Sequence, residues 1–263
     1  METIGTGLAK ADIDGHRADV YLSRPAKRNA MTAPLIEDVI AAFRTVDRDD
    51  VRAITLLGEG PVFCAGMDLE RMRCRVEADA DVPDPLDALS ELIDTIETAR
   101  QPVVVGIKRA AVAGAFELTL GCDFRVLGSE ASYGVPEVEL GTFPHVGATQ
   151  RLPRLVGLSR AKEIVLTGEY VPPASALDCG LVHEVCAPDD VDDRARTFAD
   201  RLCENAPLGL QHGKRALNEA FDRPLEDGLA FERELGRQLD DTRDYREGFD
   251  AQIEGRDTEF AGE

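Results

Sequence analysis

Two glutamates lie in apolar, glycine-marked segments where a carboxylate has no evident structural task. Glu117 lies in the stretch 112–121, and Glu137 lies twenty residues later in the stretch 133–141. An ionised carboxylate in apolar surroundings is costly unless it is paired or used in chemistry. Two carboxylates that share a site also shift each other's pKa, which is how acid–base pairs arise. The pair therefore predicts proton-transfer chemistry, and the alternative is that both side chains simply reach solvent.

Two further segments could hold a developing negative charge. The stretch 53–57, an expected strand, runs into the glycine-marked turn 58–69, and the expected strand 103–107 runs into the small residues 110–114. Small residues let a ligand approach the backbone, and the first N–H groups of a helix have no partner within it. One N–H from each segment, aimed at one point, would form an oxyanion hole. Each turn alone is also consistent with an ordinary tight turn.

An alternation of strands and helices must position these groups. Strands are expected at 18–22, 53–57, 103–107 and 124–127, and helices are expected at 34–45 and after Pro85, where Leu86, Leu89, Leu92, Ile93 and Ile96 share one face. This alternation predicts an α/β fold with parallel strand pairing. The segment 70–85 shows no clear period, so we interpret it as a mobile loop near the site or as a plain surface loop.

From residue 191 onward the pattern is helical and highly charged, with helices expected at 191–205, at 207–221 and from 225. We therefore predict two parts, a core domain at 1–190 and a C-terminal helical segment at 191–263. A helical segment of this size buries little core alone, so we expect it to pack on the first part or on another subunit.

The surface charge is strongly acidic. The 263 residues carry a net charge of −20, and only five of the 30 Lys and Arg residues are lysines. Such a surface repels phosphates, which argues against nucleic acid and anionic membranes as partners. Many acidic residues with little lysine favour a cytosol of very high salt, where screening removes the self-repulsion. The alternative is a merely acidic protein of an ordinary cytosol.

The six cysteines form no CxxC pair and no metal-ligand spacing with histidine. We expect them to be reduced, small core residues and expect no metal. The N-terminus does not read as a signal peptide, and charged residues interrupt the longest apolar stretch, 102–121. The sequence predicts a cytoplasmic protein.

Short motifs follow one another along nearly the whole chain: RPAKRNAM at 24–31, FCAGMDL at 63–69, GAFEL at 114–118, CDFR at 122–125, PE at 136–137, LGTFP at 140–144, TQRL at 149–152 and YREGF at 245–249. In this order they resemble the enoyl-CoA hydratase/isomerase, or crotonase, family. The resemblance implies a crotonase-like spiral of β–β–α turns, followed by helices that help to build a homotrimer or a dimer of trimers. It also implies an acyl-CoA thioester as substrate and no separate cofactor.

The resemblance assigns roles to individual residues. It implies that the thioester carbonyl oxygen lies between the N–H groups of Met67 and Gly114. Glu117 matches the base that activates water for attack at C3, and Glu137 matches the acid that supplies a proton to C2. The implied substrate-binding positions are Pro25, Ala26, Lys27, Arg28, Ala65, Asp68, Leu69 and Glu70.

Two residues depart from the family pattern. Phe116 replaces a glycine of the run before the first glutamate, which is expected to put bulk beside the acyl group. His145 stands where a glycine is common, so it is expected to narrow the acyl pocket or to add a group that titrates near neutral pH. The alternative for His145 is a ring that points to solvent or into the core.

The sequence thus predicts an enoyl-CoA hydratase that converts a trans-2-enoyl-CoA into the 3-hydroxyacyl-CoA. A double-bond isomerase of the same fold is the first alternative, because one carboxylate is enough to move a proton between C2 and C4. A non-catalytic acyl-CoA-binding or scaffold protein is the second. The presence of both Glu117 and Glu137 favours hydration.

Overall fold

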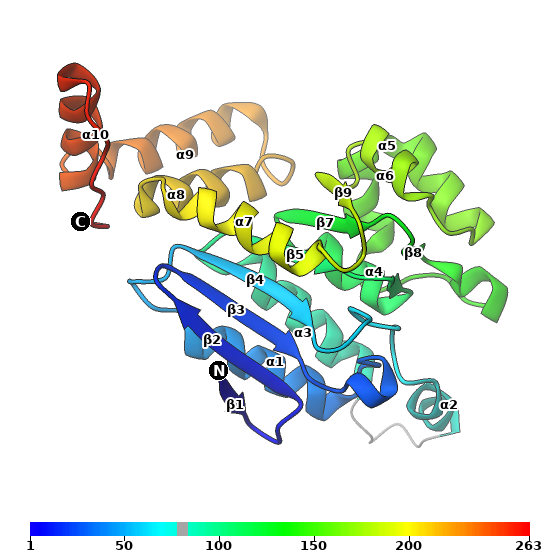
Figure 1. The fold of residues 1–263 in the computed structure, drawn as a ribbon. Helices are drawn as coiled ribbons and strands as arrows, with labels where there is room; N and C mark the ends of the chain where they lie inside the picture. Colours follow the sequence, from blue (N-terminus) through cyan, green and yellow to red (C-terminus); the bar gives the residue numbers. More distant parts are fainter. Residues whose placement is uncertain (78–83) are drawn as a thin grey trace.

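The computed structural model describes residues 1–77 and 84–263, with side chains described outside 74–77. Within these ranges a seven-stranded sheet has the strand order β1-β2-β3-β4-β5-β7-β9 (Figure 1). Its strands are β1 (Glu2–Ile4), β2 (Ala9–Asp14), β3 (Arg17–Leu22), β4 (Ala53–Gly58), β5 (Val103–Ile107), β7 (Phe124–Gly128) and β9 (Glu184–Cys186). The first three pair antiparallel, and every pair from β3 to β9 is parallel. The predicted α/β fold with parallel pairing is confirmed.

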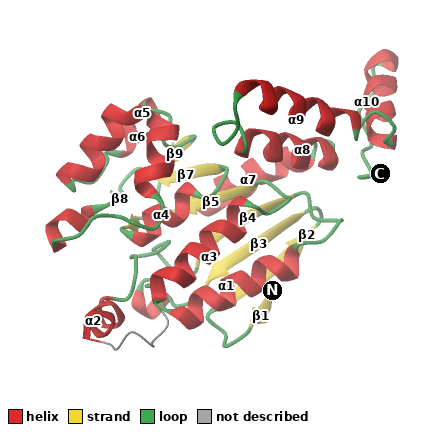
Figure 2. Ribbon diagram, turned by 180° about the vertical axis from the view of Figure 1, so that it is seen from behind, coloured by secondary structure: helices red, strands yellow, loops and turns green. Residues whose placement is uncertain are grey.

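Helices cover both faces of this sheet. They are α1 (Ala33–Val46), α2 (Leu69–Glu77), α3 (Pro85–Glu97), α4 (Gly114–Leu120), α5 (Ala148–Thr167), α6 (Pro173–Asp178), α7 (Val191–Cys203), α8 (Pro207–Asn218), α9 (Leu225–Arg237) and α10 (Arg243–Glu254), with short 3-10 turns η1 (Pro25–Lys27) and η2 (Pro136–Leu140). Helix α1 packs on β2 and β3 and on α3, whereas α7 packs on β3, β4, β5 and β7 from the other side (Figure 2).

The side chains of the strands explain why both faces must be covered. In β3, Val20 and Leu22 lie in the cluster under α1 and α3, whereas Tyr21 lies in the cluster under α7. Successive strand residues point to opposite faces, and β3 is buried at every position, so it needs a helix layer on each side. The apolar stripe expected after Pro85 is confirmed, since all five of its residues are buried in α3.

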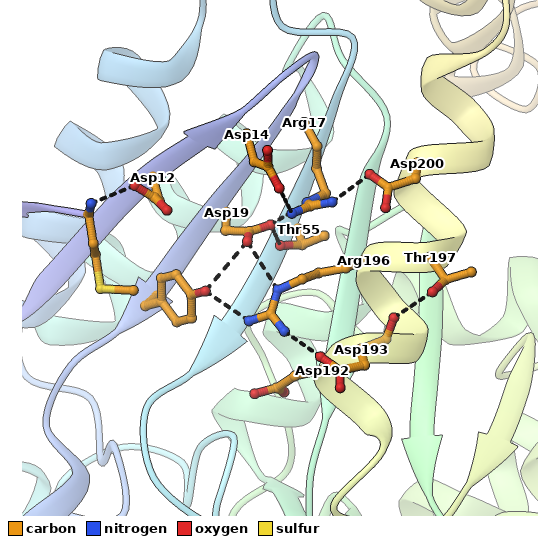
Figure 3. A network of polar contacts seen from close by, with 12 residues as sticks. Asp12, Asp14, Arg17, Asp19, Thr55, Asp192, Asp193, Arg196, Thr197 and Asp200 are labelled. Carbon is orange, nitrogen blue, oxygen red and sulfur yellow. Dashed lines mark hydrogen bonds and ion pairs between the residues drawn. The ribbon is translucent and has the colours of Figure 1, made fainter.

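A polar network ties α7 to the sheet (Figure 3). Asp19 of β3 accepts hydrogen bonds from Arg17 Nε (2.8 Å) and Thr55 Oγ1 (2.7 Å). Arg196 of α7 donates to the other oxygen of Asp19 through Nε (3.1 Å) and to the hydroxyl of Tyr21 (2.9 Å). A buried carboxylate between two guanidinium groups is fully partnered, and removal of either partner would leave an uncompensated charge. The network therefore fixes the position of α7 across the parallel strands.

The interpretation of 70–85 as a loop is wrong for its first half, because α2 is helical from Leu69 to Glu77. Asp68 starts this helix by accepting hydrogen bonds at Oδ1 from the N–H groups of Glu70 (3.2 Å) and Arg71 (3.4 Å). Among the α2 side chains that the structure describes, Met72 alone packs against the core. A helix with so little apolar surface leaves no periodic signal in the sequence. Residues 78–83 lie outside the described part.

The C-terminal helices are placed as the sequence suggested, over 191–203, 207–218, 225–237 and 243–254. Helix α7 lies on the sheet, whereas α9 and α10 lie beyond it, at the end of the molecule that carries the C-terminus (Figure 1). The boundary near residue 190 stays a prediction.

The cysteines are free throughout the described part, but only some are core residues. Cys64 and Cys122 are buried, whereas Cys179, Cys186 and Cys203 are partly exposed. The expectation of small core residues is therefore wrong for those three, which pack at the margins of the apolar clusters. Separately, none of the described helices is both long and apolar enough to cross a membrane.

Candidate active site

The turns that follow β4 and β5 lie side by side, as the sequence predicted. Cys64 forms a parallel bridge with Ala111, and its N–H donates to the Ala110 carbonyl at 3.1 Å. Gly66 has φ +96°, and a Cβ added there would lie 2.6 Å from the Val112 oxygen. A glycine at this position therefore lets two backbone segments touch where any side chain would separate them.

Within residues 1–77 and 84–263, neither the N–H group of Met67 nor that of Gly114 donates a hydrogen bond. The two residues are neighbours, since a Cβ added to Gly114 would lie 3.3 Å from Met67 Cγ. The residue before Gly114 is Ala113, which has φ 56° and ψ −127°, a strained conformation for a residue with a side chain. Two unpaired donors on adjacent segments, one of them held by strained backbone, are suited to an oxyanion.

Glu117 is held in α4 with 3% of its surface exposed. Its Oε1 accepts hydrogen bonds from the N–H groups of Val146 (2.8 Å) and Ala148 (3.1 Å). Burial raises the pKa of Glu117, and the two N–H groups act against that rise because they stabilise the carboxylate. The start of α5 therefore forms a cradle for the ionised form of this side chain.

Glu137 lies in η2 and is 9% exposed, and its own backbone N–H acts to lower its pKa. Its Oε2 is buried without a hydrogen-bond partner in the described part of the chain. Burial raises the pKa of Glu137 to about 7, and the negative charge of Glu117 adds to that rise. The structure therefore brings the two predicted carboxylates into one site and holds them differently, one stabilised as an anion and the other favoured as an acid.

His145 lies next to the cradle of Glu117, one residue before Val146. Its ring is exposed, and its Nδ1 donates to the Phe143 carbonyl at 2.8 Å. The charge of His145 acts on both Glu117 and Glu137. The ring that points to solvent, one of the alternatives for this residue, is the one that the structure contains, and an effect of His145 on the acyl pocket stays a prediction.

Phe116 lies wholly inside the core. Its ring packs against Tyr133 at a centroid distance of 4.5 Å. The ring thus fills space under α4, and its effect on the acyl group stays a prediction.

The predicted substrate-binding residues gather around the turn after β4. The residues of η1 and Arg28 are exposed, as are Leu69 and Glu70 at the start of α2, whereas Ala65 and Asp68 are partly buried. The N–H of Ala65 donates to the Arg28 carbonyl at 3.0 Å, which joins the two groups.

Two positioning residues of this turn were not predicted. Asn29 is fully buried and donates through Nδ2 to the carbonyls of Val62 and Phe63, both at 2.9 Å. Arg24 donates to Asp68 at 2.8 Å. Both residues occur inside the motif 24–31. A buried side-chain amide in such a motif must find hydrogen-bond partners, so it indicates a residue that fixes the position of nearby backbone.

Arg151 was also missed. It donates to Glu97 of α3 at 2.7 Å and contacts Asp94 at 3.3 Å, while its own N–H bonds the Gly147 carbonyl. It therefore anchors the start of α5, which supplies the cradle of Glu117, to α3. Because Arg151 and Glu97 lie 54 residues apart in the chain, their ion pair leaves no local pattern in the sequence.

Comparisons with known proteins identify the family and the fold. A family model described as enoyl-CoA hydratase/isomerase matches residues 15–263. The enoyl-CoA isomerase/hydratase fer4 of Mycosarcoma maydis is 33% identical over 253 residues, which cover 92% of each protein. A crystallised enoyl-CoA hydratase from Bacillus anthracis superposes with a TM-score of 0.91 at 30% identity, covering 97% of this chain and 100% of that one. An enoyl-CoA hydratase from Polaromonas sp. JS666 gives a TM-score of 0.92 at 29% identity, covering 96% and 99%. The expected crotonase-like fold is confirmed, and the chain belongs to the enoyl-CoA hydratase/isomerase family.

Proposed function

We propose that this protein is an enoyl-CoA hydratase that adds water across the C2=C3 bond of a trans-2-enoyl-CoA. The observation that supports hydration most directly is the unequal carboxylate pair beside two free N–H groups. The test is to mix the protein with crotonyl-CoA and follow the enone absorbance. Loss of absorbance with formation of 3-hydroxybutyryl-CoA supports the proposal, and unchanged ester after prolonged incubation would favour a non-catalytic acyl-CoA-binding protein.

The two N–H groups would act on the thioester carbonyl. As water adds at C3, negative charge moves onto the carbonyl oxygen, so donors from Met67 and Gly114 bind the transition state more tightly than the ground state. The enolate-like oxygen then has two fixed partners, and the site supplies them without any reorganisation during the reaction.

The carboxylates would divide the proton transfers between them. Glu117, stabilised as an anion by Val146 and Ala148, takes a proton from the attacking water. Glu137, whose buried oxygen favours the protonated form, gives its proton to C2. In the reactive state the pair therefore carries one proton, on Glu137, and the proposal needs no cofactor because coenzyme A is part of the substrate.

The pH dependence of hydration follows from this division. Because burial raises the pKa of Glu137 to about 7, this acid keeps its proton below that pH and loses it above. We therefore expect kcat/KM for hydration to fall as the pH rises through about 7. Rates measured across buffers of constant ionic strength would show this limb, and a profile that is flat through neutral pH would contradict the assignment of Glu137 as the acid.

A double-bond isomerase is a second candidate, because the relative from Mycosarcoma maydis carries both activities in its name. One carboxylate is sufficient for that reaction, whereas hydration uses the pair. Incubation with a 3-enoyl-CoA distinguishes the two, since an isomerase produces the conjugated ester and its absorbance.

The proposed substrate-binding surface consists of Pro25, Ala26, Lys27, Arg28, Ala65, Asp68, Leu69 and Glu70, with Phe116 and His145 near the acyl end.

We also propose assembly into a homotrimer or a dimer of trimers. Large apolar side chains in the C-terminal segment support it, since the exposed residues there include Leu217, Leu225, Phe249 and Ile253 on helices and Phe221 between α8 and α9. Such side chains favour burial against another subunit.

We further propose that the protein works at high salt, as its net charge of −20 suggests. Salt screens the repulsion between surface carboxylates, so the folded state is expected to gain stability. The melting temperature should therefore rise from low to molar KCl. Thermal unfolding across a KCl series would measure it, and a melting temperature that stays constant or falls would contradict the proposal.

A further inference from the structure

The cradle of Glu117 depends on one glycine. Gly147 joins Val146 and Ala148, whose N–H groups donate to Glu117 Oε1 at 2.8 and 3.1 Å. Its dihedral angles, φ 122° and ψ −12°, therefore help to set the angle at which the two donors converge on one oxygen. Glycine reaches this conformation at little cost, but it also leaves it easily. The geometry of the cradle thus depends on what packs against Gly147.

The side chain of Arg151 packs against this glycine. Its Nη1 occupies the space beside the Gly147 Cα, because a Cβ added to Gly147 would overlap with that nitrogen. The N–H of Arg151 also donates to the Gly147 carbonyl at 2.8 Å. Arg151 therefore holds Gly147 at two points, through its backbone and through its guanidinium group.

The other two guanidinium nitrogens of Arg151 bind α3. Nη2 donates to Glu97 Oε2 at 2.7 Å and to Asp94 Oδ1 at 3.3 Å, and Nε donates to Glu97 Oε2 at 3.2 Å. Arginine can make such a forked contact because its donors lie in one rigid plane. The side chain thus forms a bridge from α3 to the glycine that joins the two donors of Glu117.

We propose that Arg151 is a positioning residue for Glu117, because its bridge from Glu97 to Gly147 keeps both N–H groups of the cradle on one carboxylate oxygen. It acts from behind the cradle and only through Glu117. Its part in catalysis rests on the proposed function, in which Glu117 must be an anion to take a proton from water. The contacts of the bridge themselves do not depend on that function.

Loss of the bridge would change the protonation of Glu117. Burial raises the pKa of this group, and the two N–H groups act against that rise. Donors that no longer converge stabilise the carboxylate less, so the pKa of Glu117 should rise further. In the described part, charge around Glu117 also comes from His145 and Arg151, which act to lower its pKa, from Glu137, and from the two α3 carboxylates paired with Arg151, Asp94 and Glu97.

The test measures the pKa of Glu117 and the rate of crotonyl-CoA hydration in Arg151→Met. Carbon-13 NMR of labelled glutamate carboxyl groups gives the pKa, and the Glu117 signal is assigned by its absence from Glu117→Gln. We expect this pKa to rise and kcat to fall about tenfold or more, with KM nearly unchanged, because small displacements at a site are costly. The ratio of variant to wild-type rates should be lowest at low pH, where the higher pKa leaves less of Glu117 ionised.

Glu97→Ala separates the bridge from simple electrostatics. This variant removes the anchor on α3 and keeps the charge of Arg151. Loss of a nearby negative charge alone would lower the pKa of Glu117, whereas loss of the bridge would raise it. We therefore expect the same rise and the same direction of change in kcat as in Arg151→Met. A lowered pKa of Glu117 in Glu97→Ala would overturn the proposal.

Arg154→Met is the matched control, because Arg154 lies three residues later on α5 and pairs with Asp222 at 3.5 Å instead of with α3. It should leave the pKa of Glu117 and kcat unchanged. Equal losses in the Arg151 and Arg154 variants would overturn the proposal, as would a wild-type pKa of Glu117 in folded Arg151→Met. If Arg151→Met does not fold, Glu97→Ala decides the question. If the wild type does not hydrate crotonyl-CoA, the proposed function fails, and the titration still tests the role of Arg151.

Discussion

Replacing either Glu117 or Glu137 by glutamine is expected to lower the rate of crotonyl-CoA hydration at least about 100-fold. Glutamine has nearly the same shape, but it neither accepts a proton from water nor donates one to carbon. In the Glu117→Gln variant the amide oxygen can still accept from Val146 and Ala148, so the cradle should persist. Binding of the CoA ester is expected to stay close to that of the wild type, because neither carboxyl group is assigned to the coenzyme. Initial rates and ligand titrations on the same preparations would separate the two effects.

Glu139→Gln provides the matched control. Glu139 lies two residues after Glu137 in the same 3-10 turn, but it is exposed. The same loss of one charge there should leave hydration unchanged. Near wild-type turnover in either the Glu117 or the Glu137 variant would remove the two-carboxylate assignment, and a similar loss in all three variants would point to net charge instead of proton transfer.

The unequal states of the pair could not be read from the sequence. Both glutamates were identifiable by their apolar, glycine-marked surroundings, but those surroundings are alike. What distinguishes them is that Glu117 meets two N–H groups from the start of α5, whereas Glu137 Oε2 meets none in the described part. Contacts between segments 29 residues apart depend on the folded path of the chain.

The fold prediction, in contrast, succeeded because the signals it used are local. The strand 103–107 is a short run that is buried at every position, and the apolar residues of α3 repeat with the helical period, so both patterns are visible in the sequence. Helix α2 lacks that pattern because its start depends on the cap from Asp68 and its described side chains are mostly exposed. Asn29 was hidden for another reason, since its hydrogen bonds serve backbone carbonyls more than 30 residues away.

Gly66→Ala is expected to lower hydration roughly a hundredfold, the usual cost of losing one oxyanion donor. A methyl group at this position would lie 2.6 Å from the Val112 oxygen, which is backbone and cannot rotate away. The turn that carries the Met67 N–H must therefore move from the segment that carries the Gly114 N–H. The two donors would no longer point at one oxygen, so kcat should fall while the affinity for the CoA portion changes less. Steady-state rates and ester titrations would measure the two quantities.

Gly7→Ala controls for the cost of the backbone conformation. Gly7 has φ +93°, close to the φ +96° of Gly66, but the nearest described atom to a Cβ there is Thr3 Cγ2 at 3.5 Å, an ordinary contact. Both variants should lose stability in thermal unfolding, and only Gly66→Ala should lose catalysis. If Gly66→Ala does not fold, Gly114→Ala provides a milder displacement, because its methyl would press on the flexible end of Leu89 at 2.9 Å and on Met67 at 3.3 Å. Wild-type rates in both folded site variants would show that these two N–H groups do not hold the developing oxyanion.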